Sequence, residues 1–179
     1  MALAYATLLG GAVLLSLGRS QGLNWDNGMY YFPVSVEACR QVKQGVLPAL
    51  NPYQWSGAPL LAEQPTQALY PAMWIACFAS GEDPSRMMAL AYALHVAIAA
   101  GGAAMLGLAL GFSIAGALLA ATVYAANPFF TYLGTGFIVE LAVFAWLPWM
   151  LLCAHRASLA ERPLRWVAAG AVVAAAAWL

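Results

Sequence analysis

The sequence predicts an all-α membrane protein with about four complete transmembrane helices, a truncated fifth, and a long external first loop that contains short interfacial helices. Hydrophobic residues make up 64% of the chain and charged residues 8%, whereas an ordinary soluble domain carries about 25% charged residues. The apolar residues also gather into runs long enough to cross a bilayer, which takes about 20 residues in a helix. We therefore expect one membrane domain over residues 1–179, with residues 19–87 as an external cap within it.

The expected spans follow the apolar runs in chain order. They cover residues 2–18, 88–110, 113–126 and 137–154. Residues 2–18 could instead be a signal peptide, but they have no basic start, so we expect a retained helix. A fifth run from residue 164 is still apolar at residue 179 and is short for a span. We expect a fragment of a longer protein, inactive as 179 residues alone.

Positive charge predicts the orientation of these spans. Arg156, Arg162 and Arg165 lie in one short link, and short links rich in arginine stay in the cytoplasm. The N-terminus is then cytoplasmic, and the 127–136 turn and the first loop are outside a multi-pass cell-membrane protein. Residues 69–80 are also apolar but too short to span, so we expect an interfacial or re-entrant helix there.

The balance of charge and the metal-binding residue types exclude several classes of site. Seven basic and seven acidic residues cancel, which excludes the electrostatic footprint of a nucleic-acid-binding protein. Cys39, Cys77 and Cys153 show no spacing that predicts a disulfide framework or a zinc motif. His95 and His155 have no ligand-type partner at a suitable spacing, so we expect polar tips on membrane helices and no histidine site.

The first loop carries the candidate catalytic and binding residues. Asp26 follows the first predicted span and precedes an aromatic run, and a partly shielded carboxylate at the membrane boundary can act as a general base. The alternative is a solvated turn at residues 26–28. Apolar residues at helical spacing predict an amphipathic helix over residues 34–44 on the membrane surface, ended by Gly45.

A second cluster of aromatic and polar residues extends from residue 51 to residue 71. Its Trp and Tyr rings could stack on sugars while Asn, Gln and Glu bind hydroxyl groups, with Glu63 as a second acidic candidate. The alternative is an ordered aromatic belt at the interface. Arg40 and Lys43 are possible phosphate partners by their chemistry alone.

Five stretches together resemble the N-terminal part of bacterial GT-C-type membrane glycosyltransferases, most closely those of the YfhO kind. They are residues 26–33, 51–52 (Asn-Pro), 57–62 (Gly-Ala-Pro-Leu-Leu-Ala), 69–71 (Leu-Tyr-Pro) and 144–151, which contains Trp-Leu-Pro. The resemblance covers essentially the whole chain.

This resemblance implies transfer of a sugar from a polyprenyl-phosphate donor to a cell-envelope acceptor, with Asp26 as catalytic base. No cofactor is expected, and a divalent metal is not indicated. The expected partners are the lipid bilayer, the donor and other membrane subunits. The expected substrate-binding residues are Tyr30, Tyr31, Arg40, Lys43, Trp55, Glu63, Gln64 and Tyr70.

Two other functions compete with this one. The chain could be a non-catalytic transmembrane subunit that keeps a GT-C-like scaffold and binds partner helices through Gly101, Gly102 and Gly107. A transporter fragment is less favoured, because Glu140 is the only acidic residue placed well inside a predicted span. Glu140 could line a polar cavity, pair with a neighbouring helix, or lie solvated near the external helix end.

Overall fold

The structure is a computed structural model that describes residues 2–17, 26–62, 67–81 and 83–178. Helices account for 76% of the chain, which confirms the predicted helical class. The helices are α1 (Ala2–Leu17), the π-helical turn η1 (Asn27–Tyr31), α2 (Phe32–Lys43), α3 (Pro71–Ala79), α4 (Pro84–Ala109), α5 (Ile114–Ala125), α6 (Pro128–Gly136), α7 (Ile138–Leu159) and α8 (Leu164–Trp178). The strands β1 (Leu50–Asn51) and β2 (Ala58–Pro59) form a short antiparallel hairpin, so the all-α prediction was wrong at this point.

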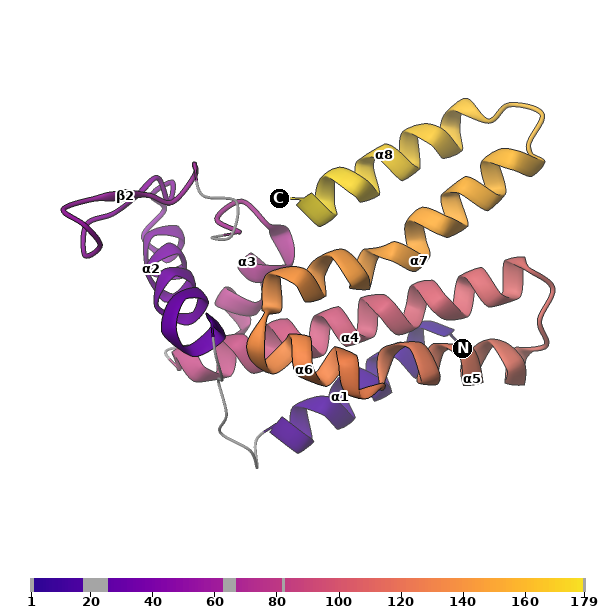
Figure 1. Ribbon diagram of the computed structural model, residues 1–179, viewed down its shortest axis with the longest axis horizontal. Coiled ribbons are helices and arrows are strands. Elements are labelled where there is room, and N and C mark those ends of the chain that lie inside the picture. The colour runs from indigo at the N-terminus through magenta and orange to yellow at the C-terminus, as the bar shows by residue number, and fades with distance from the viewer. Residues whose placement is uncertain (1, 18–25, 63–66, 82, 179) are drawn as a thin grey trace.

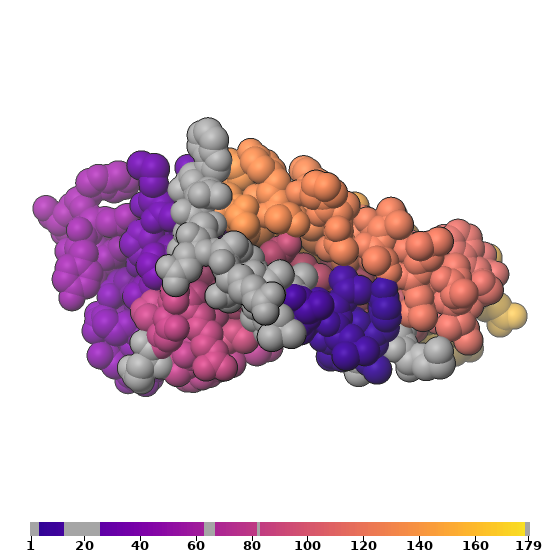
Figure 2. All heavy atoms as spheres, turned by 90° about the horizontal axis from the view of Figure 1, so that it is seen from below, coloured from indigo at the N-terminus to yellow at the C-terminus, as the bar shows by residue number. Residues whose placement is uncertain are grey.

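The molecule is elongated and has two parts (Figure 1). The first part, which we call the bundle, consists of α1 and α4 to α8, and its helices extend along the long axis. The second part, the cap, consists of η1, α2, the hairpin and α3 at one end of the bundle. The α4–α5 and α7–α8 turns lie at the opposite end, and Figure 2 shows the same separation on another face.

Two helices, α4 and α7, are long and apolar enough to cross a membrane. The pair α5 and α6 passes the same test together, although it is bent by 42°, and would make a third span. The structure thus supports two or three spans by length and composition, and the predicted count of four plus a truncated fifth is not confirmed.

Residues 127–136 were expected to form a turn and are mostly helical instead, because α6 occupies Pro128–Gly136. The Asn127 side chain caps α6 by accepting a hydrogen bond from the Phe130 N–H at 3.0 Å, and Pro128 occupies the first turn. An amide cap followed by proline is a strong helix start, so the chain resumes a helix in a new direction after α5.

The two short helices predicted in the first loop are confirmed as α2 and α3. Gly45 follows α2 with a φ of 72°, a left-handed conformation that favours glycine and ends the helix. A disulfide joins Cys39 of α2 to Cys77 of α3, and Cys153 is free and buried. The sequence prediction of no disulfide framework was therefore wrong, because the fold and not a local motif brings these two cysteines together.

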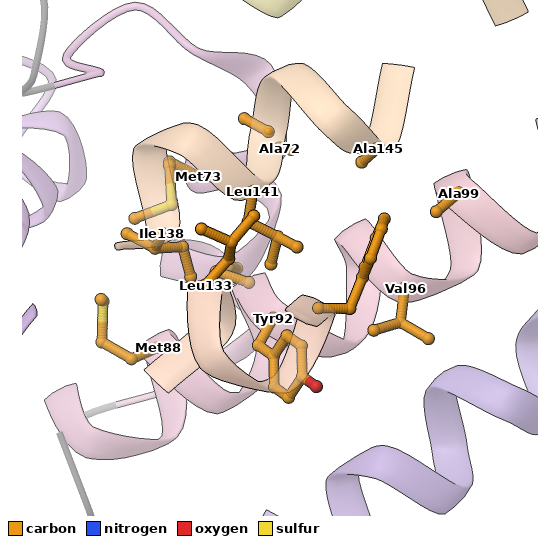
Figure 3. Close-up of a cluster of buried hydrophobic side chains, with 14 of the residues drawn as sticks. Ala72, Met73, Met88, Tyr92, Val96, Ala99, Leu133, Ile138, Leu141 and Ala145 are labelled. Atoms are coloured by element: carbon orange, nitrogen blue, oxygen red, sulfur yellow. The ribbon is translucent and has the colours of Figure 1, made fainter. Parts of the chain in front are cut away.

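The core lies where α3, α4, α6 and α7 meet (Figure 3). Its labelled side chains are Ala72, Met73, Met88, Tyr92, Val96, Ala99, Leu133, Ile138, Leu141 and Ala145. These side chains bury apolar surface from both the cap and the bundle, so the two parts share one core.

Glycines let the helices of the bundle approach closely. A Cβ atom at Gly102 would lie 2.7 Å from the Trp149 ring of α7, and one at Gly107 would lie 3.3 Å from Ala117 of α5. Gly101 is also buried and faces Trp149. All three glycines pack inside this chain, which corrects the expectation that they bind partner helices.

Candidate functional site

Asp26 lies at the start of the cap, immediately before η1. It is exposed, and the residues after it form a π-helical turn, not the solvated turn that was the alternative prediction. A π-helical turn is rare and is frequently found at functional sites. The turn presents the Asp26 carboxylate on an accessible surface while the next residue is fully buried.

Asn27 fixes the position of this turn against the bundle. It is 0% exposed, and its side-chain amide donates to the Gly134 carbonyl of α6 at 2.9 Å. Its side-chain oxygen accepts from the Ile138 N–H of α7, also at 2.9 Å. The α6–α7 junction therefore holds Asn27 by both ends of its amide, and Asp26 is adjacent to a fixed point.

The Tyr31 phenol is affected by the charge of a second carboxylate, that of Glu140, as well as by that of Asp26. Burial raises the pKa of the Tyr31 phenol above its ordinary value, and the negative charges of Glu140 and Asp26 raise it further. The charges of both carboxylates thus act on one buried phenol at the boundary between cap and bundle. Glu140 is exposed in the first turn of α7, where the helix dipole favours a negative charge.

Tyr30 lies beside Tyr31, with ring centroids 5.5 Å apart in an edge-to-face arrangement. Its ring is partly buried and packs against the core described above and against a smaller cluster inside the cap, formed by Val34, Ala38, Leu60 and Ala68. Tyr30 and Tyr31 are therefore neighbours in space as well as in sequence, and the hydrogen bond between Asn27 and Ile138 brings the start of α7, which carries Glu140, to the same turn.

Arg40 and Lys43, the predicted phosphate partners, already have partners inside the cap. Arg40 makes a bidentate ion pair with Glu37, with N–O distances of 2.6 and 2.8 Å. The hydrogen bond from Arg40 lowers the pKa of the buried Glu37 carboxyl. The Lys43 ammonium donates to the Gly81 carbonyl beyond α3. The described structure uses both cations to hold the cap together.

Trp55 lies away from this region, at the tip of the hairpin. Its side chain is 84% exposed, and Trp55 and Ser56 have φ angles of 46° and 61°. Non-glycine residues seldom adopt this left-handed conformation, and such strain often marks a functional loop. The structure does not bring Trp55 to Asp26, because the hairpin is at the outer end of the cap (Figure 1).

Tyr70 is 1% exposed and belongs to a buried network that sequence reasoning did not find. The Trp146 indole N–H donates to the Tyr70 hydroxyl at 2.8 Å, and the hydroxyl is 2.9 Å from His95 Nε2. His95 Nδ1 is 2.6 Å from the Ala91 carbonyl, so Nδ1 carries the proton and Nε2 accepts from Tyr70. Burial raises the pKa of Tyr70 to about 12.

This network connects the cap to α4 and α7, because Tyr70 precedes α3, His95 is in α4 and Trp146 is in α7. One signal in the sequence pointed to it. A histidine inside an apolar span requires a polar partner, and His95, expected as a polar tip on a membrane helix, is fully buried and bonded to Tyr70.

Glu63 and Gln64, the remaining predicted site residues, lie outside the described residues. Within the described ranges, no group of three or more His, Cys, Asp or Glu side chains could hold a metal ion. A cavity between α2, α3 and α4, lined by Ser35, Gln67 and Met87 among others, has a volume of about 10 Å³, room for one water molecule. It is far too small for a sugar.

The residues at the cap–bundle boundary can thus present the exposed carboxylates of Asp26 and Glu140 to a molecule that approaches from solvent, while the Tyr31 phenol is buried. Compared with protein-family models, curated proteins and solved structures, the chain matches none of them.

Proposed function

We propose that the chain is the N-terminal part of a GT-C-type membrane glycosyltransferase, which transfers a sugar from a polyprenyl-phosphate donor to a cell-envelope acceptor. The observation that supports it is the hydrogen bond from the Ile138 N–H to the Asn27 side chain, which joins the turn after Asp26 to the start of α7, where Glu140 lies. The resemblance of residues 26–33 and 57–62 to that class supports the same function.

In the proposed reaction, an acceptor hydroxyl attacks the anomeric carbon of the donor sugar. The Asp26 carboxylate takes the proton of that hydroxyl as the new C–O bond forms. The bond between the anomeric carbon and the phosphate oxygen breaks, and polyprenyl phosphate leaves with the electron pair. Asp26 is exposed, so an acceptor can reach it without a change of the fold.

The charges of the site indicate which substrate binds there. The exposed carboxylates of Glu140 and Asp26 would repel the negatively charged donor phosphate. Carboxylates do accept hydrogen bonds from hydroxyl groups, such as those of an acceptor or a sugar. We therefore assign the acceptor and the sugar hydroxyls, and not the phosphate, to this side of the site.

The proposed topology has four spans and a fifth apolar helix, a cytoplasmic N-terminus, and the cap outside the cell membrane. Three arginines lie around the α7–α8 turn, at the end opposite the cap, and such clusters stay in the cytoplasm. The Cys39–Cys77 disulfide supports the same sidedness, because disulfides persist in oxidising compartments outside the cytoplasm.

A non-catalytic transmembrane subunit is the second candidate function. The contacts of Arg40 and Lys43 favour it, because these side chains bond to Glu37 and to the Gly81 carbonyl inside the cap and not to a phosphate. In this alternative the cap and the bundle are a scaffold for other membrane subunits.

A sugar-transfer assay of the unchanged protein separates the two functions, and the Asp26→Asn variant tests the base. Membranes that contain the full protein are incubated with polyprenyl-phosphate-linked radiolabelled sugars, and label in envelope material is counted. We expect Asp26→Asn to lower transfer by about 100-fold or more, the typical contribution of a general base. Glu161→Gln, an exposed carboxylate at the other end of the molecule, is the matched control. Full transfer by Asp26→Asn would exclude Asp26 as the base, and no transfer by the unchanged protein would favour the subunit.

A further inference from the structure

The end of the bundle opposite the cap carries a concentration of positive charge. We call Arg156, Arg162 and Arg165 the basic turn, because they surround the link between α7 and α8. All three are exposed, and Glu161 is the single acid among them. Three arginines against one glutamate leave two positive charges here, while the remaining four basic and six acidic residues leave two negative charges elsewhere.

The basic turn is not neutralised within the described part of the chain. Among the described residues, the ion pair that forms is between Arg40 and Glu37, and it lies in the cap, at the other end of the molecule. An exposed cluster of arginines without acidic partners attracts anions, and arginine binds phosphate groups with two parallel hydrogen bonds.

The surroundings of the basic turn are those of a membrane boundary. The Arg165 guanidinium lies over the Trp166 ring, 5.6 Å from its centroid. Tryptophan is enriched at the level of lipid headgroups. Leu164 and Val167 are 77% and 56% exposed beside this pair, as expected of side chains that contact acyl chains.

A contact between helices fixes the backbone that carries the first arginine. His155 Nε2 is 3.2 Å from the Ala109 carbonyl at the end of α4. This contact holds the end of α7 against the end of α4, directly before Arg156. The cluster therefore has a defined place at the ends of the two clearest candidate spans.

We propose that the basic turn binds the headgroups of anionic phospholipids in the leaflet at this end of the bundle. The phosphate is held by the arginines, Trp166 lies at the level of the headgroups, and α8 continues into the acyl chains. This binding depends on the membrane-spanning helices and not on sugar transfer, so its failure would leave the proposed enzyme untouched.

Lipid binding to the purified full protein tests the proposal. The protein in a neutral detergent is titrated with phosphatidylglycerol and, separately, with phosphatidylcholine, and bound lipids are counted by native mass spectrometry. A basic residue at an anionic surface changes binding by about fivefold. We expect Arg162→Gln to lower the affinity for phosphatidylglycerol by about this factor and the triple Gln variant to abolish the preference for it.

Two controls separate charge from structure. Arg86→Gln removes an exposed arginine from the cap end and should leave lipid binding unchanged. Arg162→Lys keeps the charge and should keep most of the preference. Equal affinity for the two lipids, or the same loss in Arg86→Gln as in Arg162→Gln, would overturn the proposal. Displacement of the lipid by millimolar inorganic phosphate would show a site for soluble anions and would also overturn it.

Discussion

Asn27 is the residue through which the cap is fixed to the α6–α7 junction, and an isosteric change tests its importance. Asn27→Asp keeps the oxygen that accepts from the Ile138 N–H but loses the donor to Gly134. It also places a carboxylate in a fully buried position beside a carbonyl. We expect a loss of about 2 kcal/mol or more in the free energy of unfolding, measured by denaturant titration in detergent.

The neighbouring residue provides the control for this change. Asp26→Asn alters the same chemical group one position earlier, on an exposed side chain. Surface substitutions of this kind change stability by about 0.5 kcal/mol or less. Equal effects of the two variants would contradict the role of Asn27 as a fixed point.

The lowered pKa of Glu37 predicts how acid affects the stability of the cap. The hydrogen bond from Arg40 lowers the pKa of Glu37 in the folded protein relative to the unfolded chain. A carboxyl group whose pKa is lowered by folding stabilises the folded state fully at pH values above its ordinary pKa of about 4.3. This stabilisation is lost as the pH falls through the lower pKa of the folded state. We expect acid titration of the unfolding midpoint to show a smaller loss in Glu37→Gln than in the unchanged protein. An unchanged acid profile in Glu37→Gln would contradict the assignment.

At the scale of elements, two adjacent glycines of α1 test how closely it packs on α4. A Cβ atom at Gly10 would lie 2.9 Å from the Ala93 carbonyl oxygen, whereas one at Gly11 meets nothing within 4 Å. Gly10→Ala should therefore cost about 1–3 kcal/mol, because the backbones must separate. Gly11→Ala should be neutral or stabilise the helix by up to about 1 kcal/mol. Unfolding in detergent measures both, and a similar effect of the two changes would show that α1 does not pack as described.

The sequence predicted most of the elements because their signals are local. The apolar runs behind α4 and α7, the helical spacing of α2 and the short apolar run of α3 all appear within a few turns of chain. The errors arose where a local signal was overlooked or a distant contact decides. The Asn127-Pro128 pair is a local helix start that marks α6 inside the predicted 127–136 turn, whereas the Cys39–Cys77 disulfide depends on two helices that meet only in the fold.

The candidate site divides in the same way. Asp26 and the aromatic run after it could be found from the sequence, because a polar residue next to a span is conspicuous. Glu140 stands out in the sequence as an acidic residue inside an apolar span, but the contact between the start of α7 and the turn after Asp26 could not be predicted, since α7 begins more than a hundred residues later. The contacts of Asn27 and the network of Tyr70, His95 and Trp146 are likewise long-range.

At the scale of the whole molecule, labelling with a membrane-impermeant maleimide tests the orientation. Ser56→Cys places an exposed thiol on the hairpin, and Ser158→Cys places one near the basic turn. We expect Ser56→Cys to react in intact cells and Ser158→Cys to react only after permeabilisation. The unchanged protein is the background control, because Cys153 is buried and the other two cysteines are bonded. The reverse pattern would place the cap in the cytoplasm.

The hydrogen bonds of Asn27 also link the two carboxylates. Asp26 precedes Asn27 directly, and Glu140 follows Ile138, the residue that donates to the Asn27 side chain, by two positions. The Asn27 side-chain amide thus connects the turn that follows Asp26 to the helix that carries Glu140. A displacement of the start of α7 is therefore expected to move the turn that carries Asp26 together with Glu140.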